Sequence, residues 1–125
     1  MSWLLVFIGG GLGSVARLGL ARLFPPLALK AGGFPWATFS ANLLACTLLG
    51  LGLSLATKSH LTAAQQFFAL TGFCGGFSTF STFAAEAVVL LQEGYPGSAL
   101  AYVAASIACG TLAIYGVLYL TVATG

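Results

Sequence analysis

Four long hydrophobic stretches, separated by short polar or proline-containing turns, dominate the chain. They cover residues 3–23, 36–56, 63–91 and 98–122. A helix needs about 20 apolar residues to cross the hydrocarbon core of a bilayer. Strand-like alternation is not visible, and lipid requires every backbone polar group to find a partner within the protein. The pattern therefore predicts an all-α membrane protein, with four transmembrane helices in one domain over residues 1–125.

The third stretch is longer than one span needs, and its centre has an unusual composition. Residues 72–83 read GFCGGFSTFSTF. Glycine weakens a helix, and serine and threonine compete for its backbone hydrogen bonds. Non-helical backbone at membrane depth is tolerated only where it is buried or lines water, and its freed carbonyl and amide groups can bind ions. We therefore expect the third helix to be broken at its centre.

Composition supports the membrane assignment and excludes several functions. The chain is 59% hydrophobic and 5% charged, whereas a soluble domain carries roughly a quarter charged residues. A net charge of +2 without a basic run does not indicate a nucleic-acid partner. Glu86 and Glu93 are the only acidic residues, which disfavours paired-carboxylate catalysis. We see no nucleophile–base pair and no metal-ligand cluster, so we do not expect an enzyme.

Polar side chains within the spans are the candidate functional residues, because they are costly there. Asn42 lies in the middle of the second stretch, with Thr38 one turn earlier on the same face. A hydrogen bond between helices is the alternative interpretation for Asn42. In the fourth stretch Tyr102 and Ser106 share a face at i, i+4 spacing. Taken alone, such a pair more often serves packing than an ion pathway.

Two further features accompany the glycine-rich segment. Phe80 and Phe83 are three residues apart, and the electropositive edges of their rings can face one anion; plain packing is the alternative. Glu86 follows one turn later. Three roles are open for it: a proton carrier, a pore group or the partner of a cation. Arg17, in the first stretch, either acts on an anion or extends its charge to the membrane interface.

Charge and small residues bear on assembly. Arg22 and Lys30 would lie on one side of the membrane, with Arg17 if it reaches the interface, and Lys58 on the other. This difference is too small to define one orientation. The spans are rich in glycine, alanine and serine, which let membrane helices approach closely. We therefore expect a homo-oligomer. The weak charge bias is compatible with subunits that insert both ways round, and small membrane proteins with a single orientation also show such a bias.

Three motifs carry a resemblance to a known family. The first stretch contains GGGLGSVARL, a G-x-x-G-x-x-x-R pattern at Gly10, Gly13 and Arg17. The second contains FPWATFSANLLACTLLG, in which Pro35, Thr38 and Asn42 fit P-x-G-T-x-x-x-N and Ala37 replaces its glycine. The third, GFCGGFSTFSTFAAE, is the most specific. With these motifs the chain resembles the Fluc (CrcB) fluoride channel family over essentially its whole length.

The resemblance implies an antiparallel, dual-topology homodimer in the cell inner (plasma) membrane that exports fluoride passively and lowers its cytoplasmic level. It implies two pores per dimer and a structural Na⁺ ion at the dimer axis, held by the backbone carbonyls of Gly75 and Ser78. The fluoride pathway that it implies comprises Phe80, Phe83, Asn42, Ser81, Thr82, Tyr102, Ser106, Thr38, Arg17 and Glu86. The partners would be fluoride, lipid and a second copy, with no nucleic acid.

Two alternatives remain open at this stage. A proton-coupled small multidrug exporter is also a four-span antiparallel dimer, but it needs an acidic residue in its first span, where this chain has Arg17 and no acid. A membrane assembly protein that works only by packing would leave the signature of the third stretch unexplained.

Overall fold

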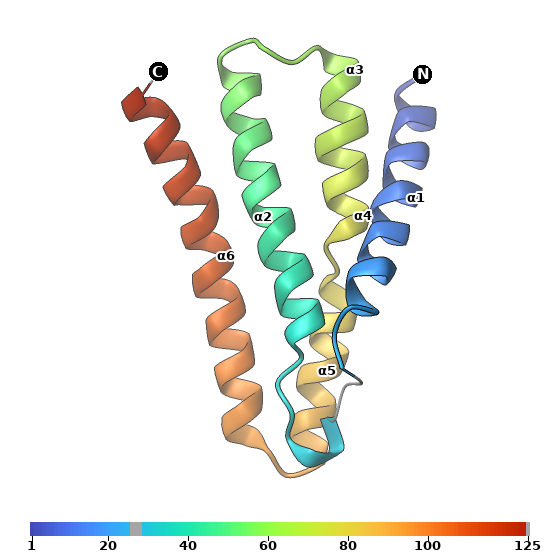
Figure 1. Ribbon diagram of the computed structural model, residues 1–125, viewed down its shortest axis with the longest axis vertical. Helices are drawn as coiled ribbons and strands as arrows, with labels where there is room; N and C mark the ends of the chain where they lie inside the picture. Colours follow the sequence, from blue (N-terminus) through green and yellow to red (C-terminus); the bar gives the residue numbers. More distant parts are fainter. Residues whose placement is uncertain (26–28, 125) are drawn as a thin grey trace.

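The computed structural model describes residues 1–25 and 29–124, and every element in this part of the chain is helical. Pro26, in the predicted first turn, lies outside the described residues. In chain order the elements are α1 (Ser2–Ala21), the 3₁₀-helix η1 (Leu29–Ala31), α2 (Trp36–Thr57), α3 (Ala63–Gln66), the π-helix η2 (Phe67–Cys74), α4 (Gly75–Phe77), α5 (Phe80–Gln92) and α6 (Pro96–Thr124) (Figure 1).

The four predicted spans are confirmed to within a few residues. The stretches that are long and apolar enough to cross a membrane are Ser2–Ala21, Trp36–Thr57, Ala63–Gln92 and Pro96–Thr121. The start of the second span follows from Pro35, since proline fixes φ and is suited to the residue before or at the beginning of a helix. Large apolar side chains such as Trp3 and Phe7 are exposed on α1, as expected for a surface that faces lipid or another protein.

The third span changes its backbone geometry several times along its length. Its first half passes from α3 into the π-helix η2 and then into one turn of α4. Ser78 (φ −82°, ψ 158°) and Thr79 (φ −150°, ψ 115°) are extended, and α5 begins at Phe80. The glycines at 72, 75 and 76 therefore lie in helical segments, and the extended backbone falls on the two hydroxyl residues that follow them.

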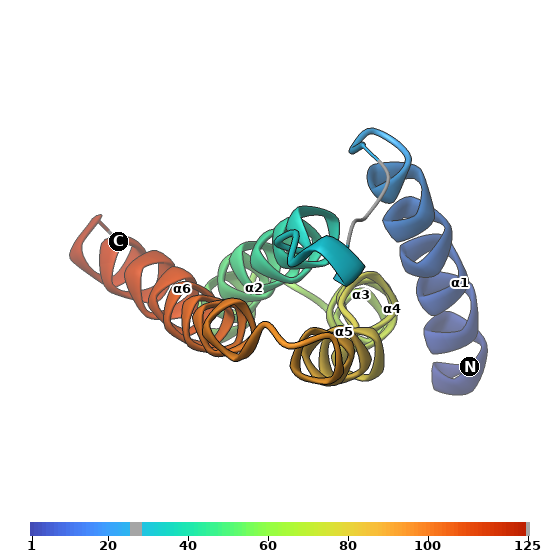
Figure 2. The ribbon, with the colours of Figure 1, turned by 90° about the horizontal axis from the view of Figure 1, so that it is seen from below.

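The four spans lie side by side, with α1 and α6 on opposite sides of the molecule (Figure 2). α1 packs against η2 and α4, whereas α6 packs against α2 and α5. The first and third loops share one end, where Gly32 lies directly against the ring of Tyr95. The second loop lies at the other end, together with both termini (Figure 1).

Glycine allows the close contact between α1 and the third span. A methyl group at Gly13 would meet the carbonyl oxygen of Phe73 and lie 2.8 Å from the backbone nitrogen of Phe77. On the opposing surface, a methyl group at Gly76 would meet the carbonyl oxygen of Gly10. The two helices thus approach backbone to backbone, a geometry that small residues favour in membranes.

We expect Gly13→Ala to destabilise the protein by about 1–3 kcal/mol, because the added methyl group forces α1 away from the third span. The measurement is the thermal unfolding midpoint of the purified protein in detergent. Gly19→Ala is the matched control on the same helix, since a methyl group there meets nothing within 4 Å. Equal midpoints for the two variants would contradict this account of the contact.

Candidate functional site

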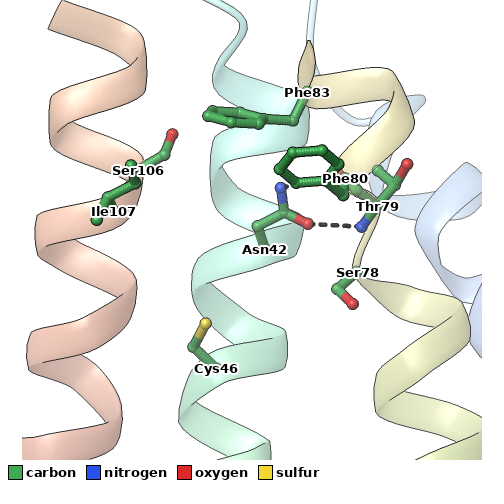
Figure 3. Close-up of a pocket in the computed structure, with 8 residues that line it drawn as sticks. All are labelled: Asn42, Cys46, Ser78, Thr79, Phe80, Phe83, Ser106 and Ile107. Atoms are coloured by element: carbon green, nitrogen blue, oxygen red, sulfur yellow. Dashed lines mark hydrogen bonds between the residues drawn. The ribbon is translucent and has the colours of Figure 1, made fainter.

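The side chain of Asn42 bonds both backbone groups of Thr79. The Thr79 N–H donates to Asn42 Oδ1 at 2.8 Å, and Asn42 Nδ2 donates to the Thr79 carbonyl at 3.3 Å (Figure 3). An unpaired backbone group in an apolar environment is costly. The side-chain amide of α2 therefore replaces the helical partners that the extended residue has lost.

Other side chains complete the hydrogen bonding around the extended residues. The Thr79 hydroxyl accepts from the backbone N–H of Thr82 at 3.2 Å and so caps the start of α5. At the end of α4, Arg17 Nε donates to the carbonyl of Gly76 at 3.3 Å, and the Ser14 hydroxyl approaches the same oxygen at 3.5 Å. Arg17 thus faces the protein and binds backbone rather than extending only towards the interface.

Glu86 is buried, and both of its carboxyl oxygens accept hydrogen bonds from hydroxyl groups. Thr38 Oγ1 donates to Oε2 at 3.1 Å, and the Tyr102 hydroxyl donates to Oε1 at 2.8 Å. The three side chains come from α5, α2 and α6 and are all buried. Within the described residues, Glu86 is therefore held by hydroxyl groups and not by a cation.

A first groove of about 270 Å³ lies between α2, α5 and α6. The rings of Phe80 and Phe83 lie beside Asn42 on one side of it, with their centroids 5.9 Å apart, and Ser106 faces them from α6 (Figure 3). The Ser106 hydroxyl is buried and has no hydrogen-bond partner among the described residues. The groove thus combines aromatic rings with an amide group and a free hydroxyl donor.

A second hollow of about 380 Å³ lies on the other side of Thr79, which lines both spaces. Its polar lining comprises Arg17, Thr38, Thr79, Thr82 and Glu86. The paired Asn42 and Thr79 therefore stand between an aromatic groove and a hollow that contains a guanidinium group.

Most predicted pathway residues line one of these two spaces or bond to a residue that does. Tyr102 is fully buried and lines neither space, but its hydroxyl donates a hydrogen bond to Glu86, which lines the second hollow. Ser81 is the exception, since it is exposed and lines neither space. Gly75 and Ser78 line a third, smaller hollow of about 160 Å³ together with Cys46 and Cys74.

Two residues of the site, Thr79 and Cys46, were not predicted from the sequence. Thr79 divides the two spaces, and a threonine just before a helical run is a recognisable N-cap signal. Cys46 lines the first groove, four residues after Asn42 and hence on the same face of α2. Both signals were present in the sequence, but neither distinguishes a wall residue from an ordinary helix position.

Comparison with known proteins identifies the family. The model of the family described as "CrcB-like protein, Camphor Resistance (CrcB)" matches residues 4–118. The chain belongs to the CrcB-like family. A protein named fluoride-specific ion channel FluC from Chlorobium phaeobacteroides is 44% identical over 115 residues, covering 91% of this chain and 87% of that protein. A protein of the same name from Phocaeicola vulgatus is 38% identical over 116 residues, covering 90% and 92%.

A third relative in the CrcB-like family, from Salmonella arizonae and also named fluoride-specific ion channel FluC, is 48% identical over 98 residues, covering 78% of this chain and 75% of that protein. All three relatives carry the name of an ion channel. Together with the four apolar helices, these relatives identify the chain as a multi-pass membrane protein.

We expect Asn42→Ala to lower the free energy of unfolding by roughly 1–3 kcal/mol, because it leaves the N–H and carbonyl groups of Thr79 without partners. Thr47→Ala is the matched control on α2, since among the described residues the Thr47 side chain bonds only the Leu43 carbonyl of its own helix, at 3.0 Å. Thermal unfolding in detergent measures both. The pairing does not support the third span if the two variants unfold at the same temperature.

Proposed function

We propose that this CrcB-like protein is a fluoride channel that exports F⁻ passively across the cell inner (plasma) membrane and so lowers cytoplasmic fluoride. The observation that carries the proposal is the first groove, where two phenylalanine rings, an amide and an unpartnered hydroxyl group converge beside extended backbone. The names of the relatives support the choice of ion.

The groove has the chemistry that fluoride requires. Fluoride is small and strongly hydrated, so a pore must replace its water with donors and still bind loosely enough for exit. The Ser106 hydroxyl is free to donate, and the electropositive ring edges of Phe80 and Phe83 add weak attraction without a formal charge. On the far side of Thr79, Arg17 places a positive charge where an anion would enter the second hollow.

Thr82 and the bonded set of Thr38, Glu86 and Tyr102 would continue the pathway through that hollow. All but Tyr102 line it, and Tyr102 donates to Glu86. The multidrug-exporter alternative gains no support from this arrangement, because the buried carboxyl group is on α5, not on the first span, and is already engaged by two hydroxyl groups of the same chain.

We further propose that the channel is an antiparallel homodimer with two pores, and that the extended residues break the third helix at the centre of the membrane. The first groove is open on one side, where the ring of Phe80 is 79% exposed, and a second copy would close it. Arg22 and Lys30 at one end and Lys58 at the other leave little charge bias between the two orientations.

The backbone at the break suits the proposed structural Na⁺ ion. In a continuous helix the carbonyls of Gly75 and Ser78 would accept from the N–H groups of Thr79 and Thr82. Those two donors are instead bonded to Asn42 and to the Thr79 hydroxyl. Both carbonyl oxygens are therefore released from the helical pattern, and two copies would supply four neutral oxygens, which are hard ligands suited to an alkali cation.

Fluoride efflux from liposomes that contain only this protein tests the proposed function. We expect efflux above that of empty liposomes, and we expect Phe80→Ile and Phe83→Ile to slow it by about tenfold, because isoleucine keeps the bulk but lacks a ring edge. Phe7→Ile is the matched control, since Phe7 is as exposed as Phe80, at 79%, but lies on α1. Efflux no faster than from empty liposomes would refute the function. Full efflux in both Phe80→Ile and Phe83→Ile would show that the two rings serve packing only.

The Na⁺ proposal predicts different results at its two positions. Ser78→Ala should leave efflux intact, because the carbonyl belongs to the backbone. Gly75→Leu should abolish efflux, although a methyl group there meets nothing within 4 Å in the single chain, because the clash would come from the second copy. Replacing Na⁺ with a large organic cation on both sides should likewise slow efflux in the unmodified protein. Efflux that is indifferent to sodium, together with an active Gly75→Leu variant, would exclude the ion.

A further inference from the structure

Tyr102 is held in place by aromatic rings from two different parts of the chain. Its side chain is fully buried. The ring of Phe83 lies 5.0 Å from it at an interplanar angle of 57°, and the ring of Phe34 lies 5.3 Å away, edge to face, at 81°. Phe83 belongs to α5, but Phe34 belongs to the connection between η1 and α2, outside the four spans.

A defined turn presents Phe34 to Tyr102. The backbone N–H of Trp36 donates to the carbonyl of Phe34 at 2.9 Å across Pro35, whose φ of −77° and ψ of 74° are those of an inverse γ-turn. Pro35 is itself fully buried. The ring of Phe34 is braced further by Trp36, at a centroid distance of 4.4 Å, and by Phe39, at 5.5 Å. This segment is therefore anchored at both its backbone and its ring.

The position of the Tyr102 hydroxyl oxygen depends on the rotation of the side chain about its Cα–Cβ bond, because the oxygen lies on the axis of the ring and moves with that axis. That hydroxyl makes the 2.8 Å bond to Glu86 Oε1. The rings of Phe83 and Phe34 together limit rotation of the tyrosine side chain. If the Phe34 ring were removed, Tyr102 would gain space to rotate, and its bond to Glu86 would lengthen.

We propose that Phe34 is a positioning residue for the fluoride pathway, acting through Tyr102 to keep the carboxyl group of Glu86 bonded and in place. The inference rests on the proposed channel function and extends it to a connecting segment that touches neither of the two spaces. Phe34 thereby links the first loop to the rate of anion passage.

The experiment is a double-mutant cycle in the liposome efflux assay with the full-length protein. We expect Phe34→Leu to slow fluoride efflux by about fivefold, within the range of a lost aromatic pair. Phe34→Tyr keeps an aromatic ring, and its efflux rate should stay within about twofold of that of the unmodified protein. If Phe34 acts through the tyrosine hydroxyl, Phe34→Leu has no further effect in a Tyr102→Phe background. Equal slowing in both backgrounds would assign Phe34 a general packing role and overturn the proposal.

Two additional measurements separate this inference from the channel function. Phe7→Leu removes an exposed ring on α1 that is not among the rings packed around Phe34 and Tyr102, and we expect it to leave efflux unchanged within about twofold. The hydroxyl proton resonance of Tyr102, assigned by its loss in Tyr102→Phe, should shift in Phe34→Leu and not in Phe7→Leu. An unshifted resonance overturns the positioning role even if fluoride passes, whereas a shift without any fluoride efflux from the unmodified protein refutes the channel alone.

Discussion

The pairing of Asn42 with the backbone of Thr79 is the interaction on which the rest of the site depends. Two extended residues within an apolar span would leave N–H and carbonyl groups without partners, at a cost of several kcal/mol for each group in lipid. One side-chain amide offers a donor and an acceptor at once and meets both groups of Thr79. α2 therefore determines where the third span can leave the helical conformation.

The same helix also fixes the buried carboxyl group. Thr38 lies one turn before Asn42 and bonds Glu86, so side chains of α2 form hydrogen bonds both to the extended residues and to α5. Tyr102 adds a third connection from α6. Because an unpaired buried polar group is costly where no water is available, these bonds align the three helices and separate the aromatic groove from the hollow at Arg17.

A chain of 125 residues with four membrane spans encloses little space alone. The first groove keeps one side open at the exposed ring of Phe80, and the faces of α1 and α6 carry large exposed apolar side chains. In a bilayer these surfaces meet either lipid or another protein. In the proposed homodimer, a second copy would cover the open side of this groove.

The sequence by itself determined the four spans, the membrane environment and the unusual third span, because apolar length and turn residues are local properties that need no knowledge of packing. It also marked Asn42, Glu86 and the phenylalanine pair, since polar or aromatic residues in such motifs are conspicuous. Only the tertiary structure decided that the extended backbone falls at Ser78 and Thr79, after the glycines, and that Glu86 bonds Thr38 and Tyr102. The exposure of Ser81 and the place of Phe34 were decided there too. These features depend on how helices far apart in the sequence cross, and crossing is set by backbone contacts such as those of Gly13 and Gly76, which no local pattern specifies.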